Sequence, residues 1–187
     1  PLAVLGPERY AGHGYLYYAE MADNLRAGEG LHRTMPYGQG DKFAIRTPGY
    51  PLLLAGLKSL PGDLTGLVAL AGALFGAASA VLCAWLAGRA FGRMAGLVAG
   101  IAVALWPHAC VHDGAMQDTA LYSALLLGLV ALVQVARDRA ASGAGIALAA
   151  ACGLLAATGV LVRVTLLLPA VALAAWLAWS AAAPFLR

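Results

Sequence analysis

The chain has 187 residues, of which 61% are hydrophobic and only 11% are charged. Soluble domains carry about 25% charged residues, so the composition excludes an ordinary soluble protein and predicts an all-α, polytopic membrane protein. The formal net charge of +3 indicates no nucleic-acid partner, because the cations form no run with interleaved aromatic residues. Three separated cysteines without a CxxC spacing predict neither a zinc site nor a disulfide framework.

The polarity of the chain divides it in two. Residues 1–63 hold six of the nine acidic residues, and we expect them to form an external loop region. Residues 64–187 are mostly apolar and are expected to form an incomplete transmembrane helical bundle. Within the first region, residues 29–45 are irregular and rich in glycine and polar residues, which predicts a loop.

A helix is predicted early in the polar region, over residues 15–27. Tyr15, Tyr18, Ala22 and Leu25 recur there at spacings of three and four, which is typical of one helix face. Gly28 is a plausible stop. Because tyrosine favours the membrane interface, we expect this helix to lie there, with its tyrosines in an interfacial belt.

The segment RTPGYPLLLA, residues 46–55, is the part around which the other features are organised. Each proline disfavours the α region for the residue before it, so Thr47 and Tyr50 are predicted to be extended. The segment then holds Arg46 just outside apolar sequence. A guanidinium there can face an anion at the membrane surface, or it can simply anchor the chain among lipid headgroups.

Several segments approach the roughly 20 apolar residues that cross a bilayer as a helix. We predict five spans: residues 64–86, 94–106, 119–136, 144–162 and 164–179. The second is short unless its helix begins near Phe91 or continues past Pro107. The last two are separated by little more than Arg163, so a tight turn is expected between them.

Glycines recur at the four-residue spacing that allows helices to approach closely in a membrane. Gly72 and Gly76 form one pair, and Gly92, Gly96 and Gly100 extend the pattern. A chain rich in alanine and glycine also produces such spacings by chance, so a packing role and a chance origin are both open.

The short loops predict the orientation of the bundle. Five arginines fall on one side, in or next to short loops: Arg89, Arg93, Arg137, Arg139 and Arg187. The loop over residues 107–118 has no lysine or arginine. An excess of cations marks the cytoplasmic side, so residues 1–63, this loop and Arg163 are expected outside.

Charged groups beside a membrane are expensive and suggest function, but each has a plainer explanation. Arg163 can be a snorkelling residue at a helix end. Asp118 can cap the helix that starts at Thr119, because aspartate is a favoured N-cap residue. His108 and His112 stand four apart near acidic residues. This spacing suits metal binding if the segment is helical. If the segment is an irregular loop, the spacing gives no reason to expect a metal site.

The order of four stretches resembles the integral-membrane glycosyltransferases of the GT-C fold. These stretches are YLYYAEMADNLRAGEG, RTPGYPLLLA, QDTALY and GLLAATGVLVRVTLLLP. The likeness is greatest to the branch of dolichyl-phosphate-mannose protein mannosyltransferases and aminoarabinose transferases. In that family a first span precedes the long external loop, so the resemblance, together with a start at Pro1 and no leader, implies a fragment of a longer protein.

The resemblance implies transfer of a sugar from a polyprenyl-phosphate donor to a protein, lipid or glycan on the outer face of a bacterial cytoplasmic membrane. Arg46 would bind the carrier phosphate, with Arg163 as a second candidate, since arginine suits phosphate oxygens. Asp118 matches an acidic residue facing the site, where it would act in catalysis or hold a divalent metal such as Mg²⁺ or Mn²⁺. The acceptor stays unidentified.

The catalytic base is where the chain departs from the family pattern. The family has an aspartate shortly before the tyrosine-rich helix, whereas this chain has His13 close to that position and Glu8 upstream. Imidazole serves as a base near neutral pH, so His13 and Glu8 are the candidates. The alternatives to a transferase are a membrane transporter, disfavoured because the span interiors carry almost no ionisable groups, and a non-catalytic scaffold.

Overall fold

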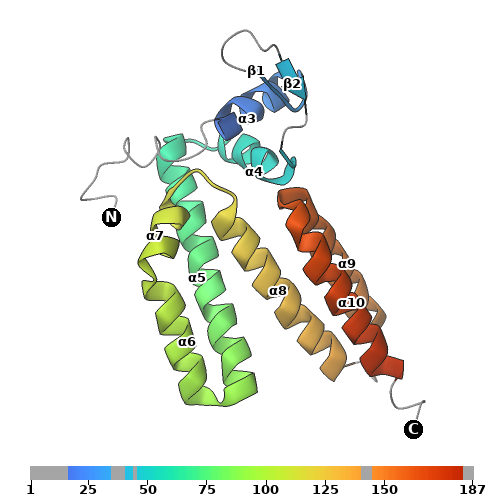
Figure 1. Cartoon of the computed structure of the whole chain (residues 1–187). Helices are drawn as coiled ribbons and strands as arrows, with labels where there is room; N and C mark the ends of the chain where they lie inside the picture. Colours follow the sequence, from blue (N-terminus) through green and yellow to red (C-terminus); the bar gives the residue numbers. More distant parts are fainter. Residues whose placement is uncertain (1–16, 35–40, 44–45, 140–144, 183–187) are drawn as a thin grey trace.

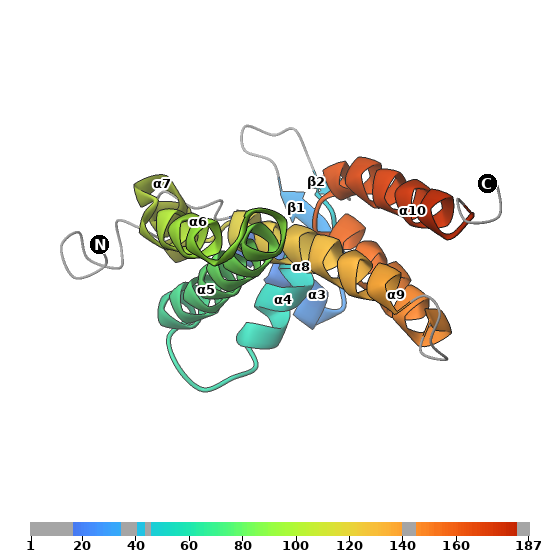
Figure 2. The same cartoon turned by 90° about the horizontal axis from the view of Figure 1, so that it is seen from below.

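The computed structural model of the chain describes residues 17–34, 41–43, 46–139 and 145–182. It is an all-α membrane bundle, as predicted. The described residues before Leu64 form a small cap at one end of the long helices (Figure 1). Viewed along the helices, α8 lies between the pair α5 and α6 and the pair α9 and α10 (Figure 2).

The cap begins with α3, Tyr17–Ala27, which confirms the described part of the predicted tyrosine-rich helix. Gly28 ends it as predicted, with a φ of 78° that glycine adopts without strain. The N–H groups of Gly28 and Glu29 donate to the carbonyls of Leu25 and Asn24, which is the Schellman pattern of a helix end.

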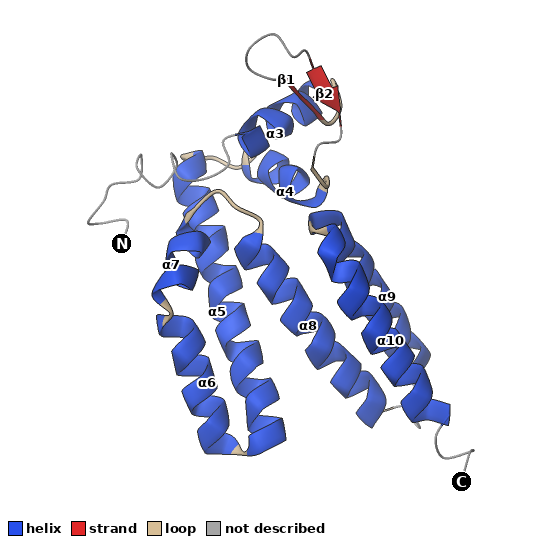
Figure 3. Cartoon of the chain, in the orientation of Figure 1, coloured by secondary structure: helices blue, strands red, loops and turns tan. Residues whose placement is uncertain are grey.

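The segment expected to be a loop contains a short antiparallel ribbon (Figure 3). Strand β1, His32–Thr34, pairs with β2, Asp41–Phe43, with His32 opposite Phe43. Asn24 of α3 donates to the carbonyl of His32 at 3.0 Å. This hydrogen bond connects the ribbon to α3 within the cap.

The prediction that Tyr50 is extended is wrong, because helix α4 spans Gly49–Leu57. Pro51 falls in the first turn of this helix, where the missing N–H has no intrahelical partner to lose. Helix α4 packs on α3 through Tyr50 and Leu54, which are both buried. Lys58 secures the pair, since its Nζ lies 3.0 Å from the carbonyl oxygen of Ala19.

Six helices and a 3-10 turn complete the described chain. They are α5 (Leu64–Phe91), α6 (Arg93–Leu105), α7 (Pro107–Gly114), α8 (Thr119–Asp138), α9 (Gly145–Val162), η1 (Val164–Leu166) and α10 (Leu167–Ala182). Asp63 caps α5 by accepting a hydrogen bond from the N–H of Gly66 at 2.9 Å. The turn expected around Arg163 is present and very tight.

The count of five spans needs correction. In the described residues, α5, α8 and α9 are long and apolar enough to cross a membrane, and α6 with α7 makes a fourth only if a 52° bend is allowed. The bend follows from Trp106, which is extended, and from Pro107 after it. The predicted fifth span, Val164–Trp179, is an apolar helix shorter than these three.

The glycine spacing reflects close packing at four of the five positions. A Cβ on Gly72 or Gly76 would collide with Asp113 of α7, and one on Gly96 would come within 2.5 Å of the carbonyl oxygen of Ala84. Gly100 likewise faces the Ala84 side chain of α5. Gly92 has another role, since its φ of 94° forms the turn between α5 and α6.

The two ends of the bundle differ in chemistry. The end opposite the cap carries the arginine-rich turns, where Arg89 pairs with Asp138 at 2.7 Å and Arg137 lies 4.9 Å from the Trp176 ring centroid. The cap, α7 and the turn around Arg163 lie at the other end (Figure 1). Residues that are far apart in sequence therefore meet beneath the cap.

Candidate functional site

Asp118 and Arg163 form an ion pair at the start of α8. The Nε of Arg163 donates to Oδ2 of Asp118 at 3.0 Å, and one terminal nitrogen donates to Oδ1 at 2.8 Å. The Asp118 side chain is only 7% exposed, whereas that of Arg163 is 38% exposed. Such a two-point contact fixes the plane of the guanidinium as well as its position.

Asp118 occupies the N-cap position of α8, but its side chain makes no capping hydrogen bond. Capping therefore does not explain this residue, because both carboxylate oxygens accept from Arg163. Its backbone carbonyl still accepts the first helical hydrogen bond, from the N–H of Tyr122 at 2.8 Å.

Arg163 is placed by the break between α9 and η1. Its N–H donates to the carbonyl of Gly159 at 2.9 Å, so it continues the hydrogen bonding of α9 while its own backbone is extended. The guanidinium lies 5.0 Å from the ring centroid of Tyr122, a cation–π distance. This contact and the ion pair show that the side chain turns back over α8, which is not how a residue that only snorkels would lie.

The segment that starts at Arg46 packs directly against the end of α9. The hydroxyl of Thr47 donates to the carbonyl of Val162 at 2.6 Å. A Cβ on Gly49 would come within 2.7 Å of the Leu161 carbonyl oxygen, so only glycine allows this approach. Residues 47–49 therefore touch the residues immediately before Arg163, which brings the two arginine-bearing segments together.

Arg46 lies over the tyrosines of the cap. It is exposed, and its guanidinium carbon is 5.5 Å from the ring centroid of Tyr17. Burial raises the pKa of the neighbouring Tyr18 phenol and the charge of Asp118 raises it further, whereas the charge of Arg46 opposes this rise only in part. Both groups are thus near one tyrosine, and they lie at the same end of the bundle.

Two buried tyrosines, one from α3 and one from α4, pack against each other near Asp118. Tyr18 and Tyr50 are each 4% exposed, and their rings meet edge to face with centroids 4.9 Å apart. Burial first, and then the charge of Asp118, raise the pKa of both phenols above the ordinary value. A hydrogen bond with the backbone of Gln117 opposes this rise at Tyr50. The balance keeps both phenols neutral and able to donate.

The sequence patterns did not predict every residue that lies around the charged groups. The tyrosines were expected in an interfacial belt, but Tyr18 lies in the core of the cap. Tyr122 had one usable signal, because it stands four residues after Asp118 and so shares its helix face. No sequence signal pointed to Arg33. Its guanidinium carbon lies 5.0 Å from the Tyr17 ring centroid, and its Nε lies 3.6 Å from Oε2 of Glu20.

The remaining predicted site residues are elsewhere. His13 and Glu8 lie outside the described residues. His108 and His112 are on α7, which is helical, with ring centroids 4.2 Å apart. In the described part of the chain no three histidine, cysteine, aspartate or glutamate side chains are placed to hold a metal ion. Since Asp118 is engaged by Arg163, a metal at Asp118 does not fit this arrangement, and we derive no chemistry from it.

Comparison with known proteins identifies one family. The sequence profile described as dolichyl-phosphate-mannose-protein mannosyltransferase matches residues 45–187. This range includes Arg46, Asp118 and Arg163. Neither the curated proteins nor the solved structures gave a significant match.

Proposed function

Because this chain belongs to the dolichyl-phosphate-mannose-protein mannosyltransferase family and is thus a membrane glycosyltransferase, we propose that it takes its sugar from a polyprenyl-phosphate donor. The acceptor is a hydroxyl of a protein, lipid or glycan, and transfer occurs on the extracytoplasmic face of a bacterial cytoplasmic membrane. The observation that carries the proposal is the ion pair of Arg163 with a buried Asp118, at the same end of the bundle as Arg46.

The first requirement of the reaction is to hold the phosphate of the donor. Arg163 uses two of the five N–H donors of a guanidinium on Asp118, and its side chain is 38% exposed. Arg46 is also exposed, and the residue after it, Thr47, contacts Val162, the residue before Arg163. Two guanidinium groups at headgroup depth suit the oxygens of a lipid phosphate and stabilise the charge that grows there as the sugar leaves.

We assign Asp118 to positioning rather than to proton transfer. Both of its oxygens accept hydrogen bonds from Arg163, and its side chain is only 7% exposed, so little of the carboxylate is open to an acceptor hydroxyl. A fixed guanidinium binds a phosphate without first losing side-chain freedom. The carboxylate therefore acts through Arg163.

The second requirement is a base for the acceptor hydroxyl. We place this role in the first external segment, on His13 or Glu8. An imidazole suits it because its pKa lies near neutral pH. A divalent metal stays a prediction that the proposed steps do not need.

Transfer of radiolabelled sugar from polyprenyl-phosphate donors by the intact, reconstituted protein tests the proposal. Arg46→Ala and Arg163→Ala should each lower transfer about tenfold to a hundredfold, the value of a charged hydrogen bond. Arg93→Ala is the matched control, because Arg93 is also exposed but is the first residue of α6, at the other end of the bundle (Figure 1). Undiminished transfer in the Arg46 and Arg163 variants would remove both residues from the mechanism.

A further inference from the structure

Each of the two arginines assigned to the donor phosphate lies over the ring of a tyrosine. The guanidinium carbon of Arg163 is 5.0 Å from the ring centroid of Tyr122, and that of Arg46 is 5.5 Å from the ring centroid of Tyr17. Both distances are within about 6 Å, the range in which a cation is attracted to the face of an aromatic ring. The rings belong to α8 and α3, so the arrangement occurs twice, on separate elements.

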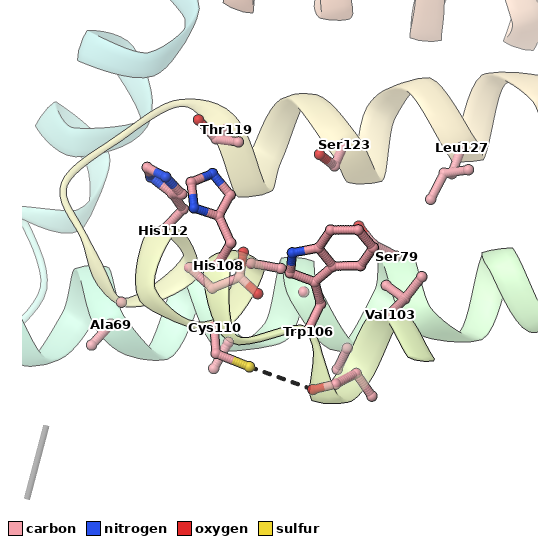
Figure 4. A pocket seen from close by; sticks show the side chains of 17 residues that line it. Ala69, Ser79, Val103, Trp106, His108, Cys110, His112, Thr119, Ser123 and Leu127 are labelled. Atoms are coloured by element: carbon pink, nitrogen blue, oxygen red, sulfur yellow. Dashed lines mark hydrogen bonds between the residues drawn. The ribbon is translucent and has the colours of Figure 1, made fainter. Parts of the chain in front are cut away.

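Tyr122 lies on a different face of α8 from the one beside α6 and α7. Thr119, Ser123 and Leu127 line a cavity on that side (Figure 4), and Tyr122 is not among its lining residues. Tyr122 is instead partly buried against the apolar cluster around Leu129, to which α9 and α10 also contribute. This packing restricts the position of its ring.

Tyr122 and Asp118 hold Arg163 together. They stand four residues apart and therefore share a helix face. Asp118 accepts two hydrogen bonds from the guanidinium, which fixes its plane, and Tyr122 adds the contact with the aromatic ring. Helix α8 thus restrains one arginine through two side chains of different chemistry.

Tyr17 is held by aromatic and charged groups of the cap. Its ring centroid lies 4.7 Å from that of Tyr18, which is buried in the core of the cap. The guanidinium carbon of Arg33 also lies 5.0 Å from the Tyr17 ring centroid, while its Nε lies 3.6 Å from Oε2 of Glu20. Two guanidinium groups therefore share one ring, which adds positive potential beside Arg46 and favours an anion there.

An aromatic ring restrains a guanidinium in a way that a carboxylate does not. Contact with the face of the ring leaves the N–H donors unused and the positive charge in place. Arg163 keeps three of its five donors after the two on Asp118. Ordering such a long side chain before the ligand arrives lowers the entropic cost of binding.

We propose that Tyr17 and Tyr122 are positioning residues of the donor-phosphate site, with Tyr17 acting through Arg46 and Tyr122 through Arg163. This inference rests on the proposed function, because it takes both arginines to bind the phosphate. The ring positions the guanidinium and the hydroxyl does not. Phenylalanine should therefore replace either tyrosine, whereas leucine should not.

The Kd of the intact protein for a polyprenyl phosphate and for the matching polyprenyl alcohol tests the inference. Tyr17→Leu and Tyr122→Leu should each lower the preference for the phosphate about fivefold and leave the Kd for the alcohol unchanged. Tyr17→Phe and Tyr122→Phe should bind like the wild type. Trp176→Leu is the matched control, because Trp176 makes the same kind of contact with Arg137, at 4.9 Å, at the other end of the bundle.

Double variants show whether each ring acts through its own arginine. Tyr122→Leu should have no further effect in Arg163→Ala but should keep its effect in Arg46→Ala, and Tyr17→Leu should behave in the reverse way.

Two results would overturn the inference and leave the proposed function intact, provided that Arg46→Ala and Arg163→Ala still lose the preference. They are leucine variants that bind like the wild type and phenylalanine variants as weak as the leucine ones. If the two arginine variants keep the preference, the proposed phosphate site fails and this inference fails with it.

Discussion

Asp118 and Arg163 are 45 residues apart in the sequence, and their ion pair is the main structural support for a phosphate site. A partly buried pair contributes little to stability by itself, because desolvation offsets the attraction. Removing one partner leaves the other charge poorly solvated, so the pair is costly to break. Here the ion pair matters for orientation, because it fixes the direction in which the exposed side of the Arg163 guanidinium points.

Replacing Asp118 tests the positioning role. Asp118→Asn keeps the shape but removes the charge and one acceptor oxygen, so Arg163 should lose its fixed orientation. The KM for the donor should rise about tenfold with a smaller change in kcat. Asp138→Asn is the control, because it breaks the Arg89 pair at the other end and should leave both constants unchanged. If kcat collapses at constant KM and the acidic limb of the pH profile disappears, Asp118 is itself the base.

The buried tyrosines predict a loss of stability in alkaline solution. Folding raises the pKa of Tyr18 and Tyr50 above the ordinary value of about 10. The stability that the neutral phenols contribute is complete below pH 10, and it declines as pH rises above 10 because only the unfolded phenols ionise. Thermal unfolding in detergent should show a falling Tm above that pH, with a smaller fall in Tyr50→Phe. A Tm equally sensitive in both proteins would contradict this.

At the scale of elements, glycine determines how closely the helices approach. Gly96→Ala should destabilise the α5–α6 pair by about 1–3 kcal/mol, because its Cβ would meet the backbone of Gly88 at 2.8 Å. Gly153→Ala on α9 is the control, since nothing lies within 4 Å of its Cβ. Denaturation in mixed micelles measures the difference. Equal stability of the two variants would mean that the helices are not in close contact.

The elements could largely be predicted because they depend on local patterns. Apolar runs gave the helices, and Gly28 and Pro107 gave a stop and a break. Tyr50 was assigned wrongly because the restriction before proline is weaker than the tolerance for proline in a first helical turn. The contact of Asp118 with Arg163 could not be predicted, since no spacing in the sequence specifies which helices become neighbours.

At the scale of the whole molecule, the site and the arginine-rich turns lie at opposite ends. If the excess of cations marks the cytoplasmic side, the cap is extracytoplasmic. In a variant without its native cysteines, Ser59→Cys should react with an impermeant maleimide in intact cells, whereas Arg93→Cys should not. Both residues are exposed, so they are matched in access. The reverse labelling would place the site in the cytoplasm.

Donor recognition is the most direct test of the phosphate site. The measurement is the Kd of the intact protein for a polyprenyl phosphate and for the matching polyprenyl alcohol, in the wild type and in Arg46→Ala/Arg163→Ala. We predict that the wild type prefers the phosphate by about tenfold to a hundredfold and that the double variant binds both lipids equally. A preference for the phosphate that survives in the double variant would contradict the assignment of these two arginines.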